Sequence, residues 1–227
     1  MFETKAKEVQ NQSQFDNYNS QGGVTMGPYT SHIWRTDPRH LGFLLARYKF
    51  VAKMLEGKKW ALEMGCGDAF GTPVVLQTVD KVTGVDWEPL LMEDNAVRLA
   101  DYNCDFQCLD ITKKAPEGEF DCAFSLDVIE HIPTEREHLY MENICKNLSR
   151  DAIFIVGCPN ITANEYASEA SKIGHINLKH HHELRALMKQ HFDNVLLFSM
   201  NDEVVHTGYY PMAHYLFAVG IGKKAHG

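Results

Sequence analysis

The stretch Trp60-Ala-Leu-Glu-Met-Gly-Cys-Gly-Asp-Ala-Phe-Gly71 joins a short apolar run to a turn that contains three glycines. The apolar run predicts a buried strand. Thr72-Pro73 directly afterwards predicts the start of a helix, with Thr72 as the N-cap and Pro73 as the first helical residue. A turn of this kind presents free backbone N–H groups and the positive end of a helix to one small space. It therefore predicts a site for a nucleoside-like ligand, and the alternative is a glycine-rich turn without a ligand.

The three glycines are expected to have separate roles. Gly65 is expected to turn the chain at backbone angles that other residues avoid, and Gly67 to let a ligand approach the backbone closely. Gly71 is expected to let the following helix pack tightly on the strand.

Outward from this stretch, apolar runs alternate with segments that have helical spacing. Further strands are expected at 81–86, 105–110, 120–127, 152–157, 194–200 and 215–221, and helices at 37–57, 89–99, 134–148 and 181–192. The loop at 201–212 is polar. Alternation of strands and helices predicts an α/β fold, doubly wound, with a mainly parallel sheet and helices on both faces.

Composition limits the class of protein. A chain of 227 residues with 44% apolar residues is long enough for one domain with a sizeable core. Its formal charge of −8 argues against a protein that binds nucleic acid by neutralising phosphates. No apolar run has the length of a signal peptide or a membrane span, so we expect a cytoplasmic protein with no membrane partner. Six cysteines without close C-x-x-C pairs are expected to be reduced thiols.

Residues 1–36 differ from the rest of the chain because they are polar and rich in Asn, Gln, Ser and Gly. They carry scattered aromatic residues, including Tyr29 and Trp34, that could dock on a folded surface. We expect an N-terminal arm or lid over residues 1–36 and one domain over 37–227. The alternative is an arm that only packs against the body.

Carboxylates follow the predicted strands, where parallel sheets bind their ligands. Asp86 lies a little over twenty residues beyond the first strand, the spacing at which a carboxylate reaches a ribose diol. Asp110 is suited to accept a hydrogen bond from the amine of an adenine, with Ile111 against the ring. Trp87 offers a flat face to the same ring, and core packing is the alternative.

Four segments together resemble the successive motifs of class I S-adenosylmethionine-dependent methyltransferases. They are Leu62-Glu-Met-Gly-Cys-Gly-Asp-Ala-Phe-Gly71, Gly84-Val-Asp86, Cys108-Leu-Asp110 and Phe120-Asp-Cys-Ala-Phe-Ser-Leu-Asp-Val-Ile-Glu-His131. The resemblance covers about residues 38–225. It implies a Rossmann-like sheet of seven strands with the last strand antiparallel, and S-adenosylmethionine as the cofactor.

By position, the resemblance implies that Glu63 and Gly65 face the methionine end of the cofactor, and that Asp127 and Val128 close the pocket near the sulfonium. Glu130 and His131 match the motif, either as part of the site or as a structural pair at a helix start. The expected cofactor contacts are Glu63, Gly65, Cys66, Gly67, Gly71, Asp86, Trp87, Asp110, Ile111, Asp127 and Val128.

Two loops are expected on the acceptor side. Gly174-His175-Ile-Asn177 resembles a pattern seen in small-molecule members of the family, which makes His175 a candidate base or acceptor contact; a histidine that only hydrogen-bonds the loop is the alternative. His206 in the 201–212 loop is the second candidate, and that loop could equally form a dimer contact. The run His180-His-His182 is interpreted as a solvated helix start, because adjacent helical residues point in different directions. With Asp127 and Asn160 as the nearest metal ligands, we expect no metal.

The sequence therefore predicts a methyltransferase that acts on a small polar acceptor, most readily an oxygen of a sugar or related metabolite, and that could form a homodimer. Two alternatives remain open at this point. One is a methyltransferase-like protein that holds the cofactor without turnover as a partner in a complex. The other is a protein or nucleic-acid methyltransferase, against which the acidic charge argues.

Overall fold

The computed structural model describes residues 5–225, and its centre is one eight-stranded sheet. The strands follow the order β3-β2-β1-β4-β5-β8-β6-β7 across the sheet. Their bounds are β1 (Trp60–Met64), β2 (Lys81–Asp86), β3 (Cys104–Cys108), β4 (Phe120–Leu126), β5 (Leu148–Pro159), β6 (Phe192–Asn201), β7 (Val204–His206) and β8 (Tyr215–Lys223). β1 to β5 pair in parallel, whereas β8 is antiparallel to both β5 and β6.

The predicted fold class is confirmed, with one difference in strand number. The segment expected to be a plain loop at 201–212 contains the three-residue edge strand β7, which pairs antiparallel with β6. Asp202 makes this pairing possible because it adopts a positive φ of 49°, a turn conformation that Asp tolerates better than most residues.

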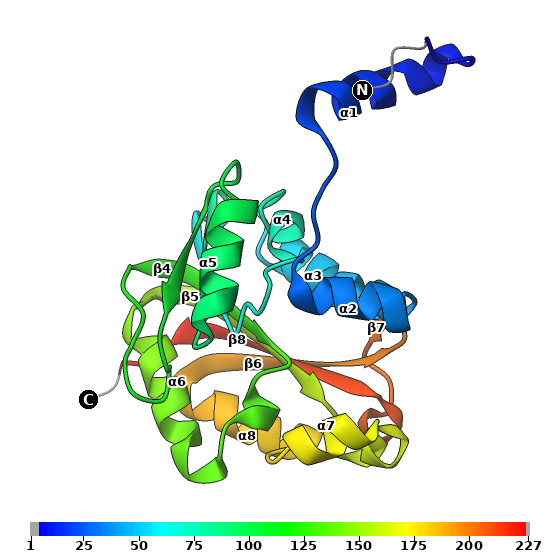
Figure 1. Ribbon diagram of the computed structural model, residues 1–227. Coiled ribbons are helices and arrows are strands. Elements are labelled where there is room, and N and C mark those ends of the chain that lie inside the picture. The colour runs from blue at the N-terminus through cyan, green and yellow to red at the C-terminus, as the bar shows by residue number, and fades with distance from the viewer. Residues whose placement is uncertain (1–4, 226–227) are drawn as a thin grey trace.

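Helices cover both faces of the sheet (Figure 1). α3 (His40–Met54), α4 (Thr72–Val75) and α5 (Pro89–Arg98) lie on one side, and α6 (Glu137–Lys146) and α8 (His181–His191) lie on the other. α7 (Glu169–Gly174) belongs to the long connection after β5. Short 3₁₀ turns lie at Val9–Asn11, Ile129–His131, Thr134–Arg136, Ile161–Tyr166 and Tyr210–Met212.

Each face of the sheet has its own apolar core. On one face, Leu62 and Phe154 pack with Tyr140 and Ile144 of α6. On the other face, Phe124 and Phe217 of the sheet pack with residues of α3 such as Val51. Strands that are buried on both faces read as continuous apolar runs, which explains why β1 and β4 were recognisable in the sequence.

Two predicted helix starts are wrong in detail. α3 begins at His40 with Arg39 as its N-cap, so Asp37, which opens the helix expected over 37–57, does not cap it. α4 begins at Thr72 itself, after Gly71. The Thr72 hydroxyl donates a hydrogen bond of 2.6 Å to Oε2 of Glu63. It therefore binds a residue of β1 and does not cap its own helix.

The N-terminal residues form two helices with different surroundings. α1 (Gln12–Gln21) stands clear of the body and buries none of its residues, whereas α2 (Pro28–Thr36) lies close to α3 and α4 (Figure 1). Across residues 5–225, the structure contains no helix with the length and apolar character that crossing a membrane requires.

The strand order fixes the position of the ligand crevice. From β1 the chain proceeds to β2 on one side, and β4 then pairs with the other side of β1. Ligands in open α/β sheets bind beyond the carboxyl ends of the strands at such a reversal. The segments that follow β1, β2, β3 and β4 therefore meet at one edge.

Candidate functional site

The turn after β1 has the backbone geometry that its glycines predict. Gly65 and Gly67 have φ values of +68° and +54°, in the left-handed region that favours glycine. The N–H groups of Gly65 and Cys66 both donate to the carbonyl of Val85, which ties the turn to β2. A Cβ on Gly65 would lie 2.2 Å from Cγ2 of Val128, so this position has no room for a side chain.

Gly71 permits a close approach, although its neighbour is not the one predicted. A Cβ at this position would lie 2.3 Å from ring atoms of Tyr48 on α3. The glycine therefore lets α3 pack against the turn rather than α4 against the strand.

Asp86 faces the glycine turn at the end of β2. Its Oδ2 accepts a hydrogen bond of 3.0 Å from the N–H of Gly67, and Oδ1 accepts from the N–H groups of Trp87 and Glu88. The side chain of Trp87 is 74% exposed, which excludes core packing as its role. The carboxylate and the exposed ring are thus both available beside the turn.

Asp110 has more local partners than a plain loop carboxylate. Oδ1 accepts hydrogen bonds from the N–H and the hydroxyl of Thr112, and Oδ2 pairs with Lys113 at 2.9 Å. The Thr112 hydroxyl, followed by Lys113, lowers the pKa of Asp110 below its usual range. Ile111 is buried next to it. Lys113 is largely exposed, so a ligand amine could take its place on Oδ2 without loss of the Thr112 contacts.

Glu63 is a buried carboxylate that ties two helices to β1. It accepts hydrogen bonds from the hydroxyl of Tyr48 at 2.9 Å and from that of Thr72 at 2.6 Å. Burial, with smaller contributions from the charges of Asp68 and Asp86, raises its pKa to about 7. The hydrogen bonds from the two hydroxyl groups act in the opposite direction and lower it. Glu63 is therefore close to half ionised at neutral pH.

The raised pKa of Glu63 predicts a pH-dependent penalty on the folded protein. The folded state favours the neutral acid, so the stability contributed by Glu63 is complete below its ordinary pKa of 4.5 and is lost as the pH rises through about 7. As the pH rises from about 5 to about 8, the free energy of unfolding of Glu63→Gln is expected to increase by about 2–3 kcal/mol relative to that of wild type. Urea unfolding at the two pH values measures this gain. A constant difference between the two proteins would contradict the assignment.

Cys66 points away from the crevice. It is buried in a cluster with Ala69 and the α5 residues Leu91 and Met92, and burial raises the pKa of its thiol well above the usual value. Its side chain therefore packs α5 against the turn.

The glycine turn also holds α2 in place. Asp68 accepts hydrogen bonds from the N–H of Thr30 at 2.7 Å and from its hydroxyl at 3.1 Å, so it caps α2 from a distant part of the chain. Tyr29 lies over Gly67, with ring atoms 3.5 Å from where a Cβ would stand. Burial raises the pKa of Tyr29, followed by the charges of Asp86 and Glu88. α2 therefore covers the turn.

Asp127, directly after β4, pairs with an arginine that the sequence analysis missed. Asp127 has a φ of +58°, and its Oδ2 accepts a hydrogen bond of 2.6 Å from Nη1 of Arg47 on α3. The guanidinium lies 3.8 Å from the centre of the Tyr215 ring. Burial has the largest single effect and lowers the pKa of the Arg47 guanidinium, but Asp127, Tyr215 and Glu130 together outweigh it and raise that pKa. No local pattern indicates this pair, because its members are 80 residues apart.

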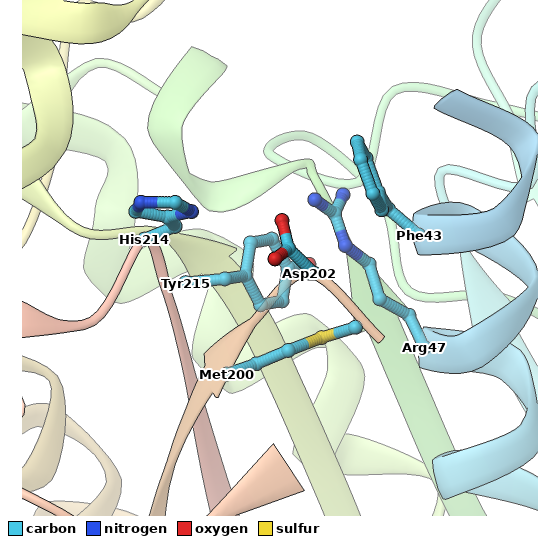
Figure 2. A pocket seen from close by; sticks show the side chains of 6 residues that line it. All are labelled: Phe43, Arg47, Met200, Asp202, His214 and Tyr215. Carbon is cyan, nitrogen blue, oxygen red and sulfur yellow. The ribbon is translucent and has the colours of Figure 1, made fainter. Parts of the chain in front are cut away.

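A small cavity of about 60 Å³ lies beside this pair (Figure 2). Its walls come from α3, the end of β6 and the start of β8, and Figure 2 shows the Arg47 guanidinium between Phe43 and Asp202. The lining residues are Phe43, Arg47, Met200, Asp202, His214 and Tyr215. Charged and apolar groups therefore share one small space next to Asp127.

His175 lies beside the turn that carries Glu130 and His131. The rings of His131 and His175 have centroids 5.1 Å apart. Burial lowers the pKa of His175, followed by the nearby His131, whereas Asp127 acts in the opposite direction. Glu130 is completely buried, and burial, followed by the charge of Asp127, raises its pKa well above the usual value. His175 therefore belongs to a cluster near Asp127 rather than to an isolated loop.

His206 is engaged within its own hairpin. Its Nδ1 accepts a hydrogen bond of 2.9 Å from the N–H of Gly208, and its Nε2 lies 3.0 Å from Oδ1 of Asn201. Both ring nitrogens have partners inside the β6–β7 hairpin, and a role for His206 as a base stays a prediction. His180 is the N-cap of α8 and forms a capping box with Glu183, as the start of a helix requires.

The geometry of the glycine turn fits S-adenosylmethionine. Asp86 presents a carboxylate suited to a vicinal diol beside this turn, and Trp87 and Asp110 lie on the adjoining segments. The Arg98 guanidinium donates to the carbonyl of Asp68, so an arginine of α5 lies against this turn.

Comparison with known proteins agrees with this fit. A family model described as a methyltransferase domain matches residues 62–156. Comparison with curated protein sequences gives no significant match.

Several solved structures share the fold. An S-adenosylmethionine-dependent methyltransferase from Clostridium acetobutylicum superimposes with a TM-score of 0.67 at 11% identity, over 85% of this chain and 97% of that one. The N-methyltransferase NodS from Bradyrhizobium japonicum in complex with S-adenosyl-L-homocysteine gives 0.59 at 14% identity, over 83% and 91%. A DhpI–SAM–HEP complex gives 0.61 at 14% identity, over 95% and 99%.

At these identities the solved structures show a shared fold, and the family model adds the motifs from β1 to β5. Both agree with the resemblance that the sequence carries in its strand-end motifs. A methyltransferase domain model therefore matches residues 62–156 of this chain, which has the fold of class I S-adenosylmethionine-dependent methyltransferases, and both findings support S-adenosylmethionine as the cofactor.

Proposed function

We propose that the protein transfers a methyl group from S-adenosylmethionine to an oxygen of a small polar acceptor, such as a sugar or a related metabolite. The observation that carries this proposal is the cavity beside Asp127, where Arg47, Asp202 and His214 line a space of about 60 Å³ together with apolar groups. Such a space admits part of a small molecule and offers it both hydrogen bonds and packing.

The proposed cofactor contacts follow the strand ends. Asp86 would hold the ribose, Trp87, Asp110 and Ile111 would hold the adenine, and the turn at Gly65 and Gly67 would hold the methionine end. Asp127 and Val128 would lie near the reacting centre. The cofactor supplies an electrophilic methyl carbon on a positively charged sulfur. The chain itself binds and aligns the two reactants and excludes water from between them.

The N-terminal arm over residues 1–36 is proposed to act as a lid. Two contacts support this proposal: Asp68 caps α2, and Tyr29 lies over Gly67. Both contacts connect the arm to the turn on which the methionine end of the cofactor would lie. The catalytic domain would then comprise residues 37–227.

The pair of Arg47 and Asp127 connects the two halves of the proposed site. Arg47 borders the cavity, and its partner Asp127 follows β4 next to Val128, which contacts the glycine turn. An acceptor in the cavity would therefore lie beside the residues that close the cofactor pocket. This continuity favours an enzyme over a protein that holds the cofactor without turnover.

The net charge bears on the acceptor class. A value of −8 disfavours an extended nucleic-acid acceptor, whose phosphates require clustered Lys and Arg. The cavity is lined by one positive and one negative side chain, Arg47 and Asp202. A lining with both signs of charge suits an uncharged polar acceptor.

Asp202 offers a test of the acceptor site. Asp202→Asn keeps the shape and tolerates the positive φ of 49°, but removes the charge from the cavity. We expect the KM for the acceptor to rise about tenfold, as for the loss of one charge-assisted hydrogen bond, with cofactor affinity unchanged. Glu203→Gln is the matched control, because Glu203 is the next residue and lies outside this cavity.

The acceptor is first found by incubating the enzyme with methyl-labelled cofactor and fractionated pools of small polar metabolites. Transfer of label to protein or RNA but not to these pools would contradict the proposed acceptor class. Equal kinetic effects of Asp202→Asn and Glu203→Gln would remove the cavity from the acceptor site. Failure of calorimetry to detect cofactor binding would contradict the cofactor sites themselves.

A further inference from the structure

Glu130, His131 and His175 form a cluster whose chemistry the proposed cofactor and acceptor contacts do not use. One ligand atom from each side chain lies within 4.8 Å of one from each of the others. Glu130 and His131 belong to the 3₁₀ turn after β4, and His175 follows α7. The cluster therefore joins two segments that are distant in the sequence.

Glu130 is the unusual member of the cluster. Its side chain is 0% exposed, and neither of its carboxylate oxygens has a hydrogen-bond partner. Buried polar groups are normally paired, and a buried carboxylate that lacks hydrogen bonds requires an ion or a proton to offset the loss of water. Each of the two histidines places one ring nitrogen within 4.8 Å of a carboxylate oxygen of Glu130, so the three side chains could share such an ion.

His131 is oriented as a metal-binding histidine would be. Its Nδ1 lies 2.9 Å from the carbonyl oxygen of Gly174. A carbonyl only accepts hydrogen bonds, so Nδ1 carries the proton and Nε2 of the neutral ring keeps a free lone pair. A hydrogen bond from one ring nitrogen to a backbone carbonyl is the usual way in which a metal-binding imidazole is fixed.

His175 is held against the same turn from both sides. The carbonyl of Gly174 before it accepts the hydrogen bond from His131, and the N–H of Asn177 after it donates to the carbonyl of Glu130 at 3.0 Å. The side chain of Asn177 adds a hydrogen bond of 3.0 Å to the carbonyl of Ile132. These contacts fix the backbone of His175 beside Glu130 and His131.

We propose that Glu130, His131 and His175 bind one divalent transition-metal ion. One carboxylate and two imidazoles suit Zn²⁺ and its first-row neighbours, whereas Mg²⁺ and Ca²⁺ prefer oxygen ligands throughout. Bond lengths of about 2.0–2.2 Å place ligand atoms about 3 Å apart, so the cluster closes by about 1–2 Å around the ion. The exposed ring of His131 and the half-buried ring of His175 have room for this rotation. The ion replaces our expectation that the protein holds no metal.

Three protein ligands leave a coordination position open, as in catalytic rather than structural sites. Glu130 and His131 follow Asp127 within four residues on the turn after β4, which places the cluster beside the pair of Arg47 and Asp127 at the acceptor cavity. An acceptor hydroxyl on the ion would release its proton to solvent more readily. Its oxygen would then form the bond to the methyl carbon while the carbon–sulfur electron pair stays on sulfur. This catalytic role rests on the proposed function, but metal binding itself does not.

Cobalt binding tests the site without any measurement of activity. The whole protein is stripped with a chelator and titrated with Co²⁺, whose visible absorption reports coordination by imidazole, and equilibrium dialysis gives the stoichiometry. We expect one ion per chain, displaced by Zn²⁺. Glu130→Gln and His175→Ala should each weaken binding about 100-fold or more, since each removes a direct ligand. His182→Ala is the matched control, because it alters the neighbouring run of histidines, and should bind as wild type does.

The outcomes separate this proposal from the cofactor and acceptor assignments. Co²⁺ binding that survives Glu130→Gln but is lost in His182→Ala would place the ion on the surface histidines and overturn the proposal, as would no binding at all. If Glu130→Gln fails to fold, His175→Ala decides, because His175 is only partly buried. Calorimetry with S-adenosylmethionine on the metal-free protein tests the cofactor site alone. Loss of cofactor binding with Co²⁺ binding intact would count against the proposed function and leave the metal site standing.

Discussion

Asp86→Ala is expected to bind S-adenosylmethionine about 100-fold more weakly than wild type. Two hydrogen bonds from a ribose diol to a carboxylate contribute about 1.5–3 kcal/mol each, and the loss of both would account for such a change. The substitution also releases the N–H of Gly67, which Oδ2 of Asp86 holds at 3.0 Å. Isothermal titration calorimetry of the purified protein measures the change in affinity directly.

Two further variants make the measurement specific. Asp86→Asn keeps one acceptor oxygen and is expected to fall between wild type and Asp86→Ala. Asp94→Ala removes a carboxylate from the neighbouring helix α5, where it pairs with Arg98 at 3.0 Å, and should leave cofactor affinity unchanged. An Asp86→Ala protein that binds the cofactor as tightly as wild type would show that Asp86 only organises the turn.

The parts of the fold that the sequence predicts are those fixed by local patterns. The apolar run at β1, the glycines after it and the carboxylate that ends β2 each have a physical reason within a few residues. Gly65 shows this most clearly, because its positive φ and its contact with Val128 both require the absence of a side chain. The strand-end residues could therefore be placed at one edge before the structure was known.

The parts that the sequence does not predict depend on contacts between distant residues. Arg47 lies in the middle of α3, which also carries Lys49 and Lys53, and charged residues of a helix normally indicate a solvated face. In the structure it is buried against Tyr215 and paired with Asp127, and neither partner is near it in the sequence. The capping of α2 by Asp68 likewise spans 38 residues.

Glu130 and His131 show why a motif alone leaves its role undecided. In the sequence they are equally consistent with a functional pair and with a structural helix start. The decisive facts are three-dimensional: the carboxylate of Glu130 is completely buried without a hydrogen bond, and Gly174 supplies the carbonyl that orients His131. The segment around His175 provides these contacts from more than forty residues away.

Gly65→Ala is expected to have the largest effect on the fold and on cofactor binding together. Alanine in the left-handed region costs about 1–2 kcal/mol, and here its Cβ would also lie 2.2 Å from Cγ2 of Val128. Overpacking of this kind costs about 1–3 kcal/mol more, because either Val128 or the turn must move. We expect a total loss of about 3–4 kcal/mol in free energy of unfolding, measured by urea denaturation.

Gly57 provides a matched control for the backbone cost. Its φ of +82° is also in the left-handed region, but a Cβ there would meet nothing within 4 Å. Gly57→Ala should therefore lose only the backbone cost of about 1–2 kcal/mol and keep full cofactor affinity. Gly65→Ala should lose cofactor affinity as well, since any shift of the turn that relieves the contact also displaces Gly67, which is hydrogen-bonded to Asp86.

A second substitution separates the collision from the backbone angle. Val128→Ala removes the two methyl groups that would lie 2.2 and 3.3 Å from the new Cβ. The double variant Gly65→Ala, Val128→Ala should therefore be more stable than the sum of the two single changes predicts, by about the overpacking cost of 1–3 kcal/mol. If the losses in free energy of unfolding of the two single variants simply add in the double variant, the turn moves to relieve the contact and Val128 does not. In that case the path of the backbone alone determines the shape of the cofactor pocket, and the side chain of Val128 does not restrict it.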